Sequence, residues 1–196
     1  MLFVKNEEIL ARVDHTASVC IPPSYVARAH AEFPGLNICT VIGFPLGYNT
    51  TACKVFETQQ AVREGASEVD MVVNLGDVKN GDFDAVEKEI EALKKAAGDN
   101  VLKVIVETCY LTQEEKIRLC ECVTKAGADY IKTSTGFGTA GATLEDIALF
   151  RAHIGPQVKV KAAGGIRTRE DLEAFCNAGC DRLGCSAAVK VLCGKG

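Results

Sequence analysis

The sequence predicts an α/β fold of the TIM (β/α)8-type barrel class, and three observations support this. Strand-like and helix-like segments alternate from Ala17 to the end of the chain through short loops, which is typical of a parallel sheet with crossover helices. The strand-like segments are almost continuously apolar, as burial on both faces requires. Lysines and carboxylates stand at several strand ends, where barrel active sites are built. An open doubly wound sheet is the alternative, but no GxGxxG follows the first strand.

Eight segments are predicted to be strands. The first is the least defined, because Ile9 to Val13 could form a short strand or the end of a helix. The others combine apolar or β-branched residues with a following turn. They are Ala17–Ile21, Asn37–Ile42, Glu68–Val73, Val101–Thr108, Tyr130–Thr133, Gln157–Lys161 and Arg182–Gly184.

Seven segments have the periodicity of helices, and several begin at a capping residue. Thr112 and Thr168 each stand three positions before an acidic residue, which is the pattern of a capping box. Ser24 is the expected N-cap of the first helix, and residues 76–81 are expected to form a loop. The predicted helices are Ser24–Glu32, Thr51–Glu64, Phe83–Ala97, Thr112–Lys125, Leu144–His153, Glu170–Ala178 and Ala187–Leu192.

Composition favours one globular domain over residues 1–196. The chain is 47% hydrophobic and 24% charged, with a formal net charge of −4 and no basic block, which argues against nucleic acid as a partner. The N-terminal stretch contains no apolar run long enough for a signal sequence or a membrane span. We therefore expect a cytoplasmic protein that acts on a small metabolite and does not bind a membrane.

Cysteine and histidine usage predicts neither disulfides nor a metal site. The ten cysteines stand singly in apolar segments with no CxxC pair, and the three histidines have no metal-binding spacing. Reduced, buried thiols that act as small hydrophobic side chains are the favoured interpretation. No metal or other cofactor is expected.

Two lysines at strand ends carry the functional hypothesis. Lys132 lies in DYIKTSTGFG and Lys161 in VKVKAAGGIRT, each at the end of an apolar run and before small residues. Burial of an ammonium group costs several kcal/mol unless it is compensated. A second cation nearby disfavours the protonated amine and makes it a nucleophile. With Asp70 inside the run EVDMVV, this set fits Schiff-base chemistry better than three separate structural charges.

A second, deeper layer of charges is expected to be structural. The period of two along a strand places Lys159 on the same face as Lys161, and Glu68 on the same face as Asp70. We expect Lys159 to pair with Glu68 or Glu107.

Two glycine-containing turns indicate a phosphate site. Gly164-Gly165 follows the seventh predicted strand, and Gly184-Cys185-Ser186 follows the eighth. Barrels commonly bind phosphate at these two positions through loop amides and a short helix. Tight turn geometry alone would also explain the glycines, but the paired location favours phosphate.

Several segments closely resemble the deoxyribose-phosphate aldolase family. The resemblance runs from Ala17 to about Val191, and the KTSTG and KxxGGxR motifs together are highly specific. The segments are IGFPLG (42–47), EVDMVVNLG (68–76), KVIVET (103–108), AGADYIKTSTGFG (126–138), VKAAGGIRT (160–168) and DRLGCS (181–186).

The resemblance implies a class I aldolase that reversibly cleaves 2-deoxy-D-ribose 5-phosphate to D-glyceraldehyde 3-phosphate and acetaldehyde without a metal. It implies that Lys132 forms the Schiff base, and that Lys161 disfavours the protonated form of Lys132 and joins Asp70 in proton transfer. For the substrate it implies Gly164, Gly165 and Ser186 at the phosphate, with Thr135, Gly136, Cys20 and Asp14 nearby. A buried structural thiol is an equally good interpretation of Cys20.

The chain departs from the family pattern near its start. Family members carry roughly 25 residues between VDHT and SVCIPP, whereas here Thr16 is followed directly by Ala17. Parallel neighbours need a crossover of a dozen residues or more, so the barrel is expected to lack its first crossover helix. Two hypotheses remain open. The chain is either an active aldolase, alone or completed by another copy in a homo-oligomer, or an impaired remnant that only binds sugar phosphates.

Overall fold

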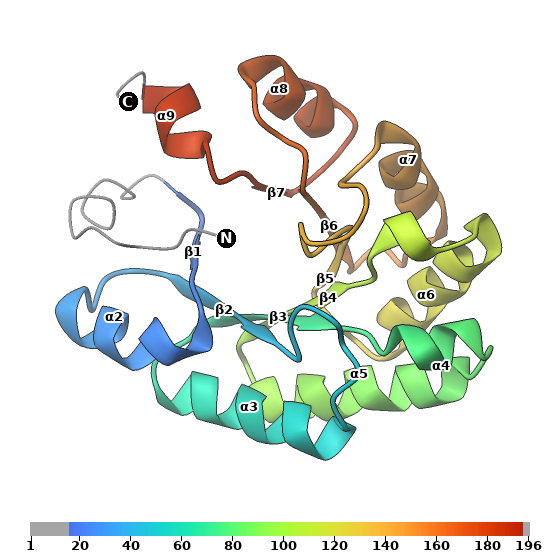
Figure 1. The fold of residues 1–196 in the computed structure, drawn as a ribbon, viewed down its shortest axis with the longest axis horizontal. Helices are drawn as coiled ribbons and strands as arrows, with labels where there is room; N and C mark the ends of the chain where they lie inside the picture. The colour runs from blue at the N-terminus through green and yellow to red at the C-terminus, as the bar shows by residue number, and fades with distance from the viewer. Residues whose placement is uncertain (1–15, 194–196) are drawn as a thin grey trace.

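The computed structural model describes residues 16–193, in which seven parallel strands form one strongly curled sheet (Figure 1). The strands follow each other in the order of the sequence, β1-β2-β3-β4-β5-β6-β7, and each pairs in parallel with the next. They are β1 (Val19–Cys20), β2 (Ile38–Ile42), β3 (Glu68–Val72), β4 (Val101–Ile105), β5 (Tyr130–Lys132), β6 (Lys159–Ala163) and β7 (Arg182–Gly184).

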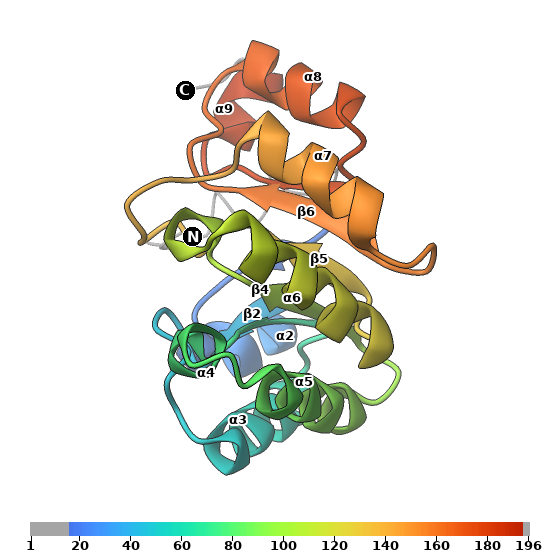
Figure 2. The ribbon, with the colours of Figure 1, turned by 90° about the vertical axis from the view of Figure 1, so that its right-hand side faces the viewer.

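Helices cover the outer face of the sheet, as Figures 1 and 2 show together. Short 3-10 turns, η1 (Pro23–Tyr25) and η2 (Thr108–Tyr110), precede two of them. The α-helices are α2 (Val26–Glu32), α3 (Thr51–Arg63), α4 (Leu75–Lys79), α5 (Phe83–Ala97), α6 (Gln113–Lys125), α7 (Leu144–His153), α8 (Arg169–Asn177) and α9 (Ala188–Cys193). Within the described range, no helix has the length and apolarity needed to cross a membrane.

The sheet curls enough for its last strand to approach its third strand. Arg182 on β7 places a guanidinium nitrogen 3.3 Å from a carboxylate oxygen of Glu68 on β3. A flat sheet would keep side chains on these two strands four strand spacings apart, or roughly 19 Å. The curl therefore encloses an interior, as the predicted barrel class requires. The predicted strand Ile9–Val13 and the residues before Thr16 lie outside the described part of the chain.

Side chains alternate between the two faces of the strands. This alternation places apolar side chains in the hydrophobic core and charged side chains in the interior of the curled sheet. In β3, Val69 and Met71 are fully buried in the hydrophobic core with the helices, whereas Glu68 and Asp70 face the ion pairs of the interior. Burial of a Val or Met side chain contributes about 1.5–3 kcal/mol. The apolar face thus holds the sheet on its helices and leaves the other face free to carry charge.

Several boundaries differ from the sequence-based expectation. Residues 76–81 were expected to be a loop, but helix α4 begins at Leu75 with the Asn74 side chain as its cap. The sixth strand lies two residues later than expected, and Ser24 sits inside η1 rather than at a helix N-cap. The capping boxes at Thr112 and Thr168 are confirmed.

Candidate active site

A single buried carboxylate, that of Asp70, lies at the centre of the candidate site. Asp70 is completely inaccessible to solvent on β3. Its Oδ1 accepts a hydrogen bond from Lys103 Nζ at 2.8 Å. Its Oδ2 accepts one from Lys132 Nζ and one from Lys161 Nζ, both at 2.8 Å. Three ammonium groups from β4, β5 and β6 therefore meet one carboxylate.

The register of the sheet explains why the two strand-end lysines meet. Lys132 of β5 and Lys161 of β6 are direct partners across the parallel pair, so their side chains leave the sheet on the same face. Because each Nζ lies 2.8 Å from the same Asp70 oxygen, the two nitrogens are no more than about 5.6 Å apart. The predicted juxtaposition of Lys132, Lys161 and Asp70 is confirmed.

The electrostatics of the cluster keep Asp70 ionised. Burial opposes its charge, but Lys132, Lys161 and Lys103 together hold the pKa of Asp70 well below its usual range. Burial also opposes the charge of Lys161, yet the facing Asp70 carboxylate raises the pKa of Lys161 above its ordinary value. Lys161 therefore keeps its proton near neutral pH.

Positive charge exceeds negative charge in this cluster. Lys103 is shared between two carboxylates, since its Nζ lies 2.6 Å from Glu68 Oε2 as well as 2.8 Å from Asp70. Within residues 16–193, Lys132 and Lys161 share one carboxylate oxygen, Asp70 Oδ2. Two ammonium groups on one oxygen repel each other, and removal of one proton relieves that repulsion.

The deeper ionic layer exists, but Lys159 does not build it. Lys159 is exposed and lies 5.8 Å from the centre of the Tyr130 ring. The ion-pair partners of Glu68 are Lys103 and Arg182 instead. The expected pairing was wrong because Lys159 is the exposed first residue of β6, whereas Lys103 is fully buried in the middle of β4. The other expected partner, Glu107, bonds to a loop.

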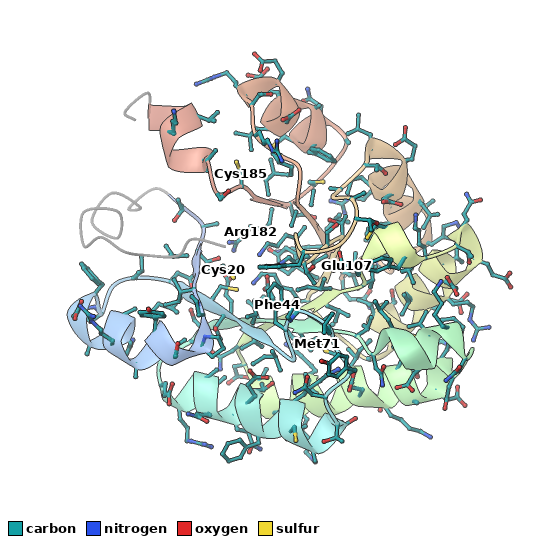
Figure 3. All side chains as sticks on the ribbon, viewed as in Figure 1. Cys20, Phe44, Met71, Glu107, Arg182 and Cys185 are labelled. Carbon is teal, nitrogen blue, oxygen red and sulfur yellow. The ribbon has the colours of Figure 1, made fainter. Side chains whose placement is uncertain are left out.

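A cavity of about 590 Å³ opens above the cluster. In Figure 3, Cys20 of β1 and Arg182 of β7 point into the space enclosed by the curled sheet, and both line this cavity. The predicted site residues that line it are Cys20, Lys132, Thr135, Gly136, Lys161, Gly164, Gly165 and Ser186. Asp70 lies beneath them, and Asp14 falls outside the described residues.

The glycine turn after β6 forms part of the cavity wall. Gly164 and Gly165 both have positive φ, at 83° and 80°, which only glycine adopts readily. A side chain at Gly164 would also meet the backbone of Gly141, whose Cα lies 3.0 Å from the expected Cβ position. The turn therefore brings bare backbone to the cavity, as an anion site built from amides requires.

Glu107 holds the loop that follows Lys132. It adopts a left-handed backbone conformation with φ of 56°, which is costly for a residue with a side chain. Its buried carboxylate accepts a hydrogen bond from the backbone N–H of Thr135 at 3.1 Å and a short one from the Thr135 hydroxyl. Because Thr135 lines the cavity, Glu107 sets the position of that part of the wall.

Sequence reasoning missed three basic residues of the site. Lys103 joins Asp70 directly, and Arg167 and Arg182 line the cavity. Lys103 gave the same signal as Lys132, a lysine inside an apolar strand. Arg167 stands within the quoted KxxGGxR motif, but nothing in its local pattern separates it from an exposed loop arginine.

One group of potential metal ligands occurs among residues 16–193. Single ligand atoms of Cys20, Cys39 and Asp70 lie within 4.8 Å of one another. However, the Asp70 oxygens already accept hydrogen bonds from three ammonium groups. These charges repel a cation, so the set is poorly suited to hold a metal.

A curled parallel sheet with a lysine pair held by one buried carboxylate beneath a cavity defines a class, the α/β-barrel enzymes that act through a lysine amine. The family follows from the sequence as a whole. The chain belongs to the DeoC/LacD family of aldolases, whose sequence model, described as "DeoC/LacD family aldolase", matches residues 4–183.

Curated relatives support this assignment along almost the whole chain. A deoxyribose-phosphate aldolase of Clostridium botulinum (strain Eklund 17B / Type B) is 56% identical over 216 residues, which cover 98% of this chain and 98% of the relative. One from Clostridioides difficile (strain 630) is 62% identical over 177 residues, covering 90% of this chain and 81% of the relative.

Solved structures confirm the fold. The aldolase QR15 superposes with a TM-score of 0.90 at 41% identity, covering 94% of this chain and 84% of that one. The deoxyribose phosphate aldolase from Aeropyrum pernix, described as a unique tetramer, gives a TM-score of 0.84 at 34% identity, covering 93% and 78%.

The relatives also bear on the short N-terminal region. The 216-residue match to the Clostridium botulinum aldolase is longer than this chain of 196 residues. At least 20 positions of that match therefore have no counterpart here. This agrees with a missing segment between Thr16 and Ala17, whose place in the chain stays a prediction.

Proposed function

We propose that this protein is a class I aldolase that reversibly cleaves 2-deoxy-D-ribose 5-phosphate to D-glyceraldehyde 3-phosphate and acetaldehyde. The observation that carries the proposal is Asp70 Oδ2, which bridges Lys132 Nζ and Lys161 Nζ at the base of the cavity. Relatives named deoxyribose-phosphate aldolase, at 56–62% identity, support the choice of substrate.

Lys132 is the proposed nucleophile. Asp70 raises the pKa of Lys161 and keeps it an ammonium, and Lys132 is the amine that reacts once it has lost its proton. The amine attacks the C1 aldehyde, and loss of water gives an iminium ion. The C2–C3 bond then breaks as the C3 hydroxyl loses its proton. The electrons of the broken C2–C3 bond pass into the iminium. This step leaves an enamine of acetaldehyde on the lysine and frees glyceraldehyde 3-phosphate.

Lys161 and Asp70 are the proposed proton-transfer pair. The enamine must gain a proton at C2 before water hydrolyses the imine and releases acetaldehyde. Lys161 carries a proton at the cavity surface, and Asp70 stays anionic below it. A positioned acid of this kind contributes about 10²–10⁴-fold to rate.

The phosphate group is proposed to lie at the opposite rim of the cavity. Backbone amides of Gly164, Gly165 and Ser186 are the candidate donors, and the positive charge of Arg167 on the same wall favours an anion there. Thr135, Gly136 and Cys20 line the cavity as well. The role of Asp14 stays a prediction.

The alternative, an impaired remnant that only binds sugar phosphates, is not favoured. Relatives above 55% identity carry the aldolase name over nearly the whole chain. The carboxylate and both amines are in contact. A remnant would be under no constraint to keep this costly buried cluster.

We also propose a cytoplasmic location and a homo-oligomeric state. A cytoplasmic location is consistent with the lack of a membrane-spanning helix in residues 16–193. A homo-oligomer is suggested by the tetrameric aldolase of Aeropyrum pernix and by exposed Leu46, Tyr48 and Phe56. Light scattering at several concentrations would measure the oligomeric state.

Turnover with a matched substrate pair tests the function. Purified protein is mixed with 2-deoxyribose 5-phosphate or with 2-deoxyribose, and acetaldehyde release is followed. We expect cleavage of both, with a much higher kcat/KM for the phosphate, because remote binding energy lowers the barrier at the reacting carbon. Folded protein that releases no acetaldehyde from either compound would overturn the proposal.

A further inference from the structure

Two cysteines on neighbouring strands face each other inside the sheet. Cys20 of β1 and Cys39 of β2 are direct register partners in a parallel pair. Neighbouring strands lie about 4.8 Å apart, which is within the Cα separation of natural disulfides. The two sulfur atoms lie within 4.8 Å of each other. This placement is compatible with a disulfide once the side chains rotate.

The two thiols differ in access. Cys20 is partly exposed and lines the cavity above the lysine pair. Cys39 has no solvent exposure, and its sulfur lies 3.2 Å from Asp70 Oδ1. A small reagent that enters the cavity therefore meets Cys20 first, and Cys39 can react only with a modified Cys20.

The surroundings of the two thiols also shift their pKa values in opposite directions, which makes Cys20 the more reactive. A hydrogen bond from Cys39 lowers the pKa of Cys20 to about 6, helped by Lys132 and Lys161 and opposed by burial and by Asp70. The same hydrogen bond, together with burial, raises the pKa of Cys39 well above its ordinary value. The lowered pKa enlarges the thiolate fraction of Cys20 at neutral pH, and the thiolate is the form that attacks oxidants.

We propose that Cys20 and Cys39 are an oxidisable dithiol within the cavity, which hydrogen peroxide converts to a disulfide. The Cys20 thiolate attacks one peroxide oxygen, the O–O bond breaks, and the hydroxide that leaves takes up a proton as water. Cys20 becomes a sulfenic acid. The sulfur of Cys39 then attacks it, the S–O bond breaks, and a second water leaves with the Cys39 proton.

Electrons balance in this sequence. Two thiols lose two electrons in total, and one peroxide is reduced to two molecules of water. The chemistry requires no step of the proposed aldolase reaction. Its readout is a mass, so failure of the aldolase proposal and failure of this one are distinguishable.

Peptide mapping after peroxide treatment tests the proposal. Trypsin places Cys20 in peptide 13–28, but peptide 29–54 contains both Cys39 and Cys53. The experiment therefore uses the Cys53→Ser variant, which changes an exposed thiol. We expect the two peptides to become linked, with the loss of two hydrogens, and to separate after treatment with dithiothreitol.

A half-buried thiol elsewhere provides the internal comparison. Cys109 is partly exposed and is the sole cysteine of tryptic peptide 104–116. We expect Cys20 to be oxidised at least about tenfold faster than Cys109 at pH 7, because Lys132 and Lys161 favour the thiolate of Cys20. Equal rates at the two thiols would contradict the proposal.

The resolving role of Cys39 is tested by substitution. In Cys39→Ser and Cys39→Ala variants, in the Cys53→Ser background, we expect no linked peptide and accumulation of sulfenic and sulfinic acid at Cys20. Both substitutions are made so that a folding defect in one variant does not prevent the test in the other. Oxidation of Cys20 straight to sulfinic acid while Cys39 is present, or its linkage to a different cysteine, would overturn the proposal.

Discussion

Two buried lysines in this protein show how a structural ion pair differs from a reactive one. Lys54 on α3 has no solvent exposure, and its Nζ donates to Glu89 at 2.8 Å and to the Val72 carbonyl at 2.9 Å. Lys132 must share one Asp70 oxygen with Lys161 and faces a cavity. The Lys54 amine pairs with its own carboxylate and is closed to substrate. The Lys132 amine shares one carboxylate oxygen with Lys161 and is open to the cavity.

A shifted pKa does not by itself mark the functional amine. Burial lowers the pKa of Lys54, against the opposing effect of Glu89, yet no substrate can reach it. In the Asp70 cluster, the facing carboxylate raises the pKa of Lys161. The comparison shows that shared counter-charge and access, taken together, identify the site.

Asp70→Asn should have the largest effect. The substitution leaves three buried ammonium groups without their common anion, which is expected to cost about 3–5 kcal/mol of stability. Loss of the anion that orders Lys132 and Lys161 should lower kcat about 10²–10⁴-fold. Urea unfolding and acetaldehyde release measure the two effects. If the variant had the stability and turnover of the wild type, Asp70 would be needed for neither the fold nor the reaction.

The difference in free energy of unfolding between wild type and Asp70→Asn should depend on pH in a defined direction. Because the folded-state pKa of Asp70 lies well below its ordinary value of 3.8, the stabilisation is present above about pH 4 and is lost as pH falls through the folded value. The difference in free energy of unfolding between wild type and Asp70→Asn should stay constant from about pH 5 to 8 and shrink only under stronger acid. A difference that vanishes near pH 6 would contradict this.

Lys161→Leu should change rate and pH dependence together. Without the second ammonium on Asp70 Oδ2, the repulsion between two positive charges on that oxygen is lost, so imine formation should slow about tenfold at pH 7 and its pH–rate profile should move upward. Trapping rates with acetaldehyde and borohydride measure the profile. Lys159→Leu is the matched control, since Lys159 is exposed on the same strand, and its profile should not move. An unshifted profile in Lys161→Leu would show that the coupling is absent.

Glu89→Gln should affect stability alone. Removal of the partner of Lys54 should cost about 3 kcal/mol in urea unfolding, with kcat unchanged while the protein is folded, because the pair lies between α3 and α5 and outside the cavity lining. A fall in kcat as large as in Asp70→Asn would contradict the assignment of Lys54 and Glu89 as a purely structural pair.

Glu107→Gln should have the smallest effect. Glutamine keeps the shape of Glu107 but offers one acceptor oxygen to the two donors of Thr135. The cavity wall should loosen, and KM for the sugar phosphate should rise about fivefold with kcat nearly unchanged. A fall in kcat without a change in KM would instead indicate a direct role in the chemical step.

The sequence predicts the order of elements well because apolar strands and capping boxes are local signals. The Thr112 capping box and the helix that it starts are found where expected. Strand ends are less predictable, since pairing with neighbours sets them, and β6 runs Lys159–Ala163 because it pairs with both β5 and β7. That residues 1–196 form one domain stays a prediction, as residues 1–15 and 194–196 lie outside the described part.

Within the site, the sequence reveals which residues carry chemistry better than which residues touch. Lys132, Lys161 and Asp70 stand out as charges in apolar strands, and their contact follows from a barrel. The partners of Glu68 and the contact of Cys20 with Cys39 depend on exact register and on the curl of the sheet. No local pattern encodes either, so these contacts emerge only from the structure.

Borohydride trapping with acetaldehyde tests the central claim most directly, because reduction fixes the imine on the lysine that forms it. Digestion and mass mapping of the wild-type protein should place the reduced adduct on Lys132, and the Lys132→Arg variant should carry none. An adduct on Lys161 or Lys159 in the wild type, or folded protein without any adduct, would contradict the assignment of the reactive amine.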